Sequence, residues 1–168
     1  LGDVYKRQVL AQIQDARMFT LDLEDDWSLP NDFASKVNTA GAKLTCVVNP
    51  HAPSGHLNSI PTLKGLVEKL EGVLLVDEAY ADFVDADEPS SMAALVTEHE
   101  NLLVLRTFSK GYSLAGLRLG YLLGHSSLIH PVLEKTRDSY NVDAISQAIG
   151  LAAIEDQAYA RQTWATVR

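Results

Sequence analysis

The sequence has little cysteine, few basic residues and no long apolar run. Its single cysteine, Cys46, cannot form an internal disulfide or a multi-thiolate metal site, so the chain is compatible with a reducing compartment. Lys and Arg number 14 against 22 Asp and Glu, and the formal net charge of −8 argues against nucleic acid or an anionic membrane as the main partner. The apolar runs stay well below the roughly 20 residues of a membrane-spanning helix. These absences predict a cytoplasmic protein that binds neither nucleic acid nor membrane.

The sequence does contain enough apolar material for one globular domain. Of its 168 residues, 46% are hydrophobic and 21% are charged, which is typical of a folded chain. Short β-branched and Leu-rich runs alternate with segments of helical periodicity, a pattern that predicts a layered α/β fold with a largely parallel sheet. The predicted strands are 18–23, 43–48, 73–76, 102–106 and 119–123, and the predicted helices are 31–38, 59–70, 91–99, 127–136 and 143–161. Cys46 falls within the second of these strands, where we expect a small buried side chain.

The first eight residues stand apart from this pattern. Residues 1–8 (LGDVYKRQ) lack an initiator Met and look like foreign sequence, such as a translated cloning adapter. We therefore leave them out of the functional interpretation.

Polar side chains follow three of the predicted strands at the point where each strand ends. The stretch 49–55 (NPHAPSG) follows the strand 43–48, Asp-Glu-Ala-Tyr at 77–80 follows the next, and Thr-Phe-Ser-Lys at 107–110 follows the third. Ligands of open α/β sheets bind beyond the carboxyl ends of the strands, so we expect these groups to meet at one edge. Taken singly, Asp77 could cap a turn and Lys110 could be a solvated loop lysine. Their occurrence together and in this order is what predicts a site.

The histidines of this region do not predict a metal site. His51 and His56 are separated by Pro53 and Gly55, which prevent them from sharing one helix face. We therefore expect no metal ligands in the chain.

The three motifs together resemble those of the class I/II aminotransferases, the fold-type I pyridoxal-phosphate family. The matching residues are Asn-Pro-x-x-Pro-Ser-Gly at 49–55, Asp-Glu-Ala-Tyr at 77–80, and Ser-Lys at 109–110 with an arginine eight residues after the lysine. The later stretch 138–147 (DSYNVDAISQ) resembles the segment that leads out of the large domain in histidinol-phosphate aminotransferases. The resemblance implies an incomplete three-layer α/β sandwich with a mostly parallel sheet. Residues 9–140 would form part of the large cofactor-binding domain, and 141–168 would start the connection to the small domain.

The resemblance implies three catalytic residues. Lys110 matches the family lysine that binds pyridoxal phosphate covalently and then moves the proton of the reaction. Asp77 matches the carboxylate that keeps the pyridine nitrogen protonated, so that the ring can accept electrons. Tyr80 matches a phenol that donates a hydrogen bond to the ring oxygen.

Further residues match cofactor-binding positions of the family. Asn49 matches a second hydrogen-bond donor to the ring oxygen. Ser109, Arg118 and Thr107 match the hydroxyl groups and the cation that hold the phosphate.

The activity implied by the resemblance is transamination between histidinol phosphate and 2-oxoglutarate in histidine biosynthesis, by a homodimer that takes a small-molecule amino donor and a 2-oxo acid. Aromatic-amino-acid aminotransferases and amino-acid-phosphate decarboxylases of the same fold share these cofactor contacts and stay open as alternatives. A non-catalytic cofactor-binding fragment also stays open. The family's glycine-containing phosphate loop, stacked aromatic residue and substrate-binding arginine are not among these 168 residues. We therefore predict that this chain by itself is catalytically silent.

Overall fold

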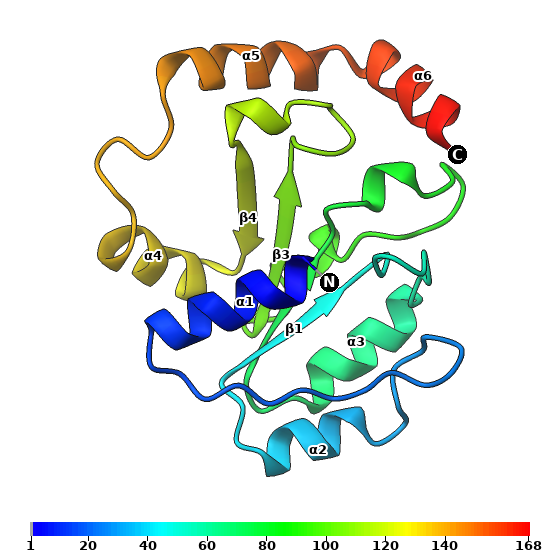
Figure 1. Cartoon of the computed structure of the whole chain (residues 1–168), viewed down its shortest axis with the longest axis vertical. Coiled ribbons are helices and arrows are strands. Elements are labelled where there is room, and N and C mark those ends of the chain that lie inside the picture. The colour runs from blue at the N-terminus through cyan, green and yellow to red at the C-terminus, as the bar shows by residue number, and fades with distance from the viewer. Residues whose placement is uncertain (1) are drawn as a thin grey trace.

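The fold is built on a four-stranded mixed sheet with helices on both faces (Figure 1). The computed structural model describes residues 2–168, and the side chains of residues 6–168. The strand order is β1-β2-β3-β4, in which β1 to β3 are parallel and β4 is antiparallel to β3. The strands are β1 (Leu44–Val48), β2 (Val73–Asp77), β3 (Leu102–Thr107) and β4 (Gly120–Gly124). The predicted α/β architecture with a mostly parallel sheet is therefore confirmed.

One face of the sheet carries the hydrophobic core. Alternate residues of the parallel strands are buried there because successive side chains of a strand point to opposite faces. They cluster with the buried side chains of α2 (Phe33–Thr39) and α3 (Ile60–Lys69). Each fully buried aliphatic side chain contributes about 1.5–3 kcal/mol, so this face holds the strands in register. The cluster includes Phe33, Val37, Val47, Leu63, Leu66, Val67, Leu74, Val76, Leu102 and Val104.

The second face of the sheet is covered less completely. In Figure 1, α1 (Gly2–Ile13) crosses in front of the strands and α4 (Ser126–Lys135) lies beside β4. Leu44 is 54% exposed and Cys46, two residues further along the same side of β1, is also exposed. The prediction that Cys46 is buried is therefore wrong, because strand alternation places it on this partly open face.

The segment 18–23 is not a strand. Its backbone is extended, but it joins no ladder among the described residues. Leu21 and, further on, Leu29 pack against the core cluster. Leu21, one of the apolar residues that predicted a strand, therefore packs on the core, while the segment 18–23 pairs with no strand of the described residues.

The predicted helix 91–99 is also wrong. Only one 3₁₀ turn, η2 (Ala93–Leu95), forms there. The Met92 N–H donates to Glu78 Oε1 at 2.6 Å and the Ser91 hydroxyl donates to Glu78 Oε2 at 2.8 Å. The Ser91 hydroxyl and the Met92 N–H, which could cap and begin a helix, therefore bind the Glu78 carboxylate instead.

The predicted helix 143–161 is divided into α5 (Ala144–Glu155) and α6 (Gln157–Val167). Asp156 lies between them, and its carboxylate caps α6 by accepting the Tyr159 N–H at 3.1 Å. The predicted limits of α2, α3 and α4 are correct within two residues. None of the helices in residues 2–168 combines the length and apolar character that a bilayer crossing requires.

Candidate functional site

The three motif-bearing loops leave the same edge of the sheet, because β1, β2 and β3 are parallel (Figure 1). The Asn49 N–H donates to the Asp77 carbonyl at 2.9 Å, and the Glu78 N–H donates to the Leu105 carbonyl at 2.9 Å. The loops after β1, β2 and β3 are thus neighbours, as the order of motifs predicts.

Asp77 is the last residue of β2, and its side chain is only 12% exposed. One carboxylate oxygen, Oδ1, accepts the Ala79 N–H at 3.1 Å. The other, Oδ2, accepts Arg7 Nη2 of α1 at 2.5 Å. A carboxylate held this way presents one oxygen to a cationic N–H group.

Lys110 and Tyr80 meet above the ends of β3 and β2. Lys110 Nζ lies 5.0 Å from the centre of the Tyr80 ring, which is within range of a cation–π contact. Tyr80 begins the 3₁₀ turn η1 (Ala81–Phe83), whose Phe83 ring lies 6.4 Å from the Tyr80 ring. Residues predicted from two separate motifs are therefore in direct contact.

Thr107 and Ser109 form the turn that leads from β3 to Lys110. Thr107 Oγ1 accepts the Ser109 N–H at 3.0 Å and donates to the Leu119 carbonyl at 3.4 Å. The Leu119 carbonyl also accepts the Phe108 N–H at 3.1 Å. The Thr107 hydroxyl thus fixes the path of the loop that carries both Ser109 and Lys110.

Asn49 is fully buried and already has partners in this structure. Its Oδ1 accepts the Asn58 N–H at 2.8 Å and its Nδ2 donates to the Asn58 carbonyl at 3.1 Å. These bonds close the loop that runs from β1 to α3. Asn49 therefore has a structural role in addition to its predicted one.

Arg118 lies in the turn before β4, one residue before Leu119, whose carbonyl accepts the Thr107 hydroxyl. It follows the 3₁₀ turn η3 (Ala115–Leu117), has a left-handed backbone with φ of 54°, and donates Nη1 to the Ala115 carbonyl at 2.9 Å. It lines a cavity together with Asn141, Asp143 and Ser146 at the start of α5. Within residues 6–168, no hydrogen bond or ion pair joins Arg118 to Thr107 or Ser109.

A buried charged cluster lies next to these residues, and the sequence interpretation missed it. We name it the Arg106 cluster; its members are Glu78, Asp82, Ser91 and Arg106. Arg106 Nε donates to Glu78 Oε2 at 2.8 Å, Nη1 donates to Asp82 Oδ1 at 3.2 Å, and Nη2 donates to Ser91 Oγ at 3.1 Å. The Glu78 side chain is fully buried, and that of Arg106 is 18% exposed. The guanidinium thereby joins the end of β2, η1 and the segment before η2.

Burial dominates the electrostatics around the Arg106 cluster. Desolvation raises the pKa of Asp82 above its ordinary value, with Arg106 opposing the rise and Glu78 adding to it. Tyr121 pairs with Arg106 across β3 and β4, and burial likewise raises the pKa of its phenol. The site therefore offers a low-polarity surrounding in which ion pairs are stronger than in water.

The missed residues left different signals in the sequence. Glu78 and Arg106 are opposite charges at the ends of neighbouring predicted strands, and such positions favour pairing between charges. Arg7 belongs to the segment 1–8 that looks like foreign sequence, and nothing in that segment indicates a contact with Asp77.

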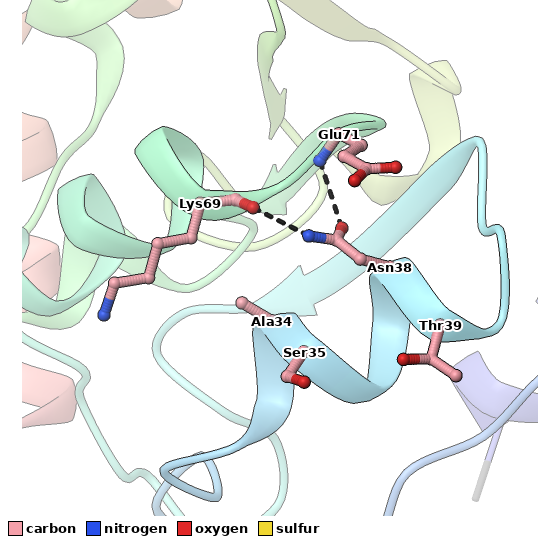
Figure 2. A pocket seen from close by; sticks show the side chains of 6 residues that line it. All are labelled: Ala34, Ser35, Asn38, Thr39, Lys69 and Glu71. Carbon is pink, nitrogen blue, oxygen red and sulfur yellow. Dashed lines mark hydrogen bonds between the residues drawn. The ribbon is translucent and has the colours of Figure 1, made fainter.

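A second depression lies away from this edge of the sheet. Figure 2 shows it between α2 and the end of α3, lined by Ala34, Ser35, Asn38, Thr39, Lys69 and Glu71. The Asn38 amide spans it, donating to the Lys69 carbonyl at 2.8 Å and accepting the Glu71 N–H at 3.1 Å. The amide thus ties α2 to the turn before β2. In the described part of the chain, no three His, Cys, Asp or Glu side chains gather as metal ligands would.

Comparison with known proteins gives a consistent result. The model of the family "Aminotransferase class I and II" matches residues 8–167. The chain is 39% identical over 161 residues to histidinol-phosphate aminotransferase 1 of Trichormus variabilis, covering 96% of this chain and 44% of that protein. It is 46% identical over 129 residues to histidinol-phosphate aminotransferase 1 of a Nostoc species, and the match covers 77% of this chain and 35% of that protein.

A solved structure agrees with these relatives. Histidinol-phosphate aminotransferase from Sinorhizobium meliloti, in complex with pyridoxal-5'-phosphate, superposes with a TM-score of 0.84 at 26% identity. The superposition covers 94% of this chain and 43% of that one. The chain thus spans less than half the length of the relatives it matches.

Proposed function

Because the chain belongs to the class I and II aminotransferases, we propose that the whole protein transfers an amino group with pyridoxal phosphate as its cofactor. Its amino donor is histidinol phosphate and its acceptor is 2-oxoglutarate, in histidine biosynthesis. The relatives named histidinol-phosphate aminotransferase support this choice of donor.

The described residues fit the cofactor at its ring nitrogen. Asp77 Oδ2 accepts a hydrogen bond from the Arg7 guanidinium, so the carboxylate is oriented to take a cationic N–H group. A protonated pyridine nitrogen is a donor of the same kind. In this chain Arg7, which lies in the segment 1–8 that we propose to be foreign, must release Asp77 before a ring nitrogen can bind there.

When bound, pyridoxal phosphate supplies an aldehyde that takes up the amino group and a ring that accepts the electron pair of the substrate carbon. The residues of this chain would position it and move the proton. Lys110 Nζ would hold the cofactor between turnovers and take the proton from the substrate α-carbon. The position of Lys110 Nζ over the Tyr80 ring supports this role, because the Tyr80 phenol then lies beside the amine that would hold the cofactor.

The remaining predicted residues would hold the ring oxygen and the phosphate. Tyr80 would donate its hydroxyl to the ring oxygen, and Asn49 would donate the amide N–H that Asn58 does not use. The Ser109 and Thr107 hydroxyls and the Arg118 guanidinium would bind the phosphate dianion.

The single observation that carries the proposal is the contact between Lys110 and Tyr80 beside the strand end that bears Asp77. It is tested in the full-length protein by adding pyridoxal phosphate, reducing with borohydride and locating the pyridoxyl group by mass spectrometry. We expect the label on Lys110. Label on other lysines with Lys110 unmodified would overturn the assignment.

The reaction itself is tested by incubating the full-length protein with histidinol phosphate and 2-oxoglutarate. We expect glutamate to form, and we expect Lys110→Ala to abolish it. Release of carbon dioxide from an amino-acid phosphate without glutamate would favour a decarboxylase instead.

We propose the finer organisation on the basis of the resemblance. Residues 1–8 are foreign, 9–140 are part of the large domain and 141–168 begin the connection to the small domain. The whole protein is a cytoplasmic homodimer. Light scattering of the full-length protein should give twice the mass of one chain, and a monomer would contradict the proposal.

A further inference from the structure

The Arg106 cluster connects the two loops that carry the predicted catalytic residues. Glu78 lies between Asp77 and Tyr80 in the sequence, and Arg106 lies on β3 four residues before Lys110. Arg106 Nε and Glu78 Oε2 are 2.8 Å apart. The ends of β2 and β3 are therefore joined by an ion pair in addition to the backbone ladder.

Asp82 makes a second connection, directly at the residue after Lys110. A Cβ atom placed on Gly111 would lie 2.3 Å from Asp82 Oδ2 and 2.7 Å from Asp82 Cβ. Cβ atoms essentially never approach another heavy atom this closely, so a side chain at this position would force a shift. The Asp82 side chain therefore rests against the Gly111 backbone, where only glycine leaves room for it.

Gly111 is held from another direction as well. Trp164 of α6 donates its indole Nε1 to the Gly111 carbonyl at 2.7 Å. The Trp164 ring also packs edge-on against Tyr112, with ring centres 5.6 Å apart. The backbone next to Lys110 thus has little freedom to shift unless Asp82 or Trp164 moves.

We propose that Arg106 and Asp82 are positioning residues that hold Lys110 against Tyr80, and that they act through the contact between Asp82 and Gly111. The inference rests on the proposed function, because it concerns the lysine assigned to the cofactor. Arg106 fixes Asp82 through Nη1, and Asp82 supports Gly111. Glu78 orients Arg106 and is itself held by Ser91 and Met92.

The inference predicts a local effect on Lys110. In Asp82→Ala, Arg106 loses its Nη1 partner and Gly111 loses its support, so Lys110 can leave the Tyr80 ring. In Gly111→Ala, the new methyl group forces the loop away from Asp82. In Asp82→Asn, the amide oxygen still accepts from Arg106 and the shape is kept, so Lys110 should stay in place.

A matched control is available at the other end of β3. Asn101 donates Nδ2 to the carbonyls of Val67, Leu70 and Gly72 at 3.0, 3.3 and 3.4 Å. Asn101→Ala removes a comparable polar anchor without touching the edge that carries Lys110. A variant that acts only on overall stability should behave like this control.

The experiment measures the chemical reactivity of Lys110 in the 168-residue chain without cofactor. The chain is labelled with a trace of acetic anhydride, and mass spectrometry compares Lys110 with the exposed Lys135 at the end of α4 as an internal reference. Thermal unfolding followed by circular dichroism measures stability in parallel.

We expect Asp82→Ala and Gly111→Ala to raise the ratio of Lys110 to Lys135 labelling by about threefold or more, equivalent to ~0.65 kcal/mol by the tenfold-per-1.36 relation. Asp82→Asn should keep the parent ratio, and Asn101→Ala should lower the melting temperature without changing the ratio. An unchanged ratio in Gly111→Ala, or an equal change in Asn101→Ala, would overturn the inference.

Two further outcomes are also decisive. If Asp82→Ala fails to fold, Gly111→Ala and Asp82→Asn still test the inference, since one should raise the ratio and the other should not. Failure of the full-length protein to bind pyridoxal phosphate would overturn the proposed function. It would leave the labelling ratio unaffected, so the two failures are distinguishable.

Discussion

Replacing Arg106 with methionine should destabilise the chain more at neutral pH than in mild acid. Arg106 is the cation for Glu78, which is fully buried, and for Asp82, whose side chain is 11% exposed. Methionine fills the space but leaves two buried carboxylates without their cation. Removing one partner of a buried ion pair costs about 3–5 kcal/mol. That is a large share of the ~5–15 kcal/mol that stabilises a domain.

The pH dependence follows from the pKa of Asp82. Burial raises this pKa in the folded chain, and Arg106 opposes the rise, so the variant should raise it further. An acid whose folded pKa exceeds its unfolded value destabilises the fold when the pH lies above the folded pKa. The penalty disappears as the pH falls below the unfolded value. The loss of unfolding free energy should therefore shrink as the pH is lowered from about 7 toward about 4.

Urea unfolding of parent and Arg106→Met chains at several pH values measures this difference. The double variant Glu78→Gln, Arg106→Met is the control, and it should recover part of the loss because it removes a buried charge. A loss below about 1 kcal/mol at neutral pH, the size of an exposed ion pair, would refute the reasoning. So would a loss that is equal at both ends of the pH range.

Three further predictions concern the candidate site and Cys46. Arg7→Ala should tighten binding of pyridoxal phosphate to the chain by up to about fivefold, the effect of a partly exposed ion pair, because Arg7 competes for Asp77. A fluorescence titration measures this, and weaker binding would contradict it. Asp77→Asn in the full-length protein should leave the cofactor bound but slow proton abstraction by about 10²-fold or more. Single-turnover kinetics decide the matter, and a rate within about threefold of the parent would refute the role of Asp77. Desolvation raises the pKa of the Cys46 thiol, so its reaction with a thiol reagent should be slow near neutrality and accelerate as the pH rises. A rate that does not depend on pH would contradict this.

The failed secondary-structure predictions share one physical cause. The segment 18–23 does contain apolar residues and 91–99 does have helical periodicity. In both segments, however, tertiary contacts decide the backbone conformation. Leu21 packs on the core without pairing, and Glu78 takes the donors of Ser91 and Met92. Local pattern cannot report a hydrogen bond to a residue 13 or 14 positions away.

The sequence by itself determined the order of the four strands and of α2, α3 and α4, and the edge of the sheet that carries the loops of Asn49, Asp77 and Lys110. Hydrophobic periodicity and strand ends are local properties, and parallel strands must present their carboxyl ends together. Only the tertiary structure decided which side chains touch: Lys110 on Tyr80, and Arg106 between Glu78 and Asp82. These contacts depend on how neighbouring strands and loops pack, because a buried charge needs its partner within hydrogen-bond distance, wherever that partner lies in the sequence.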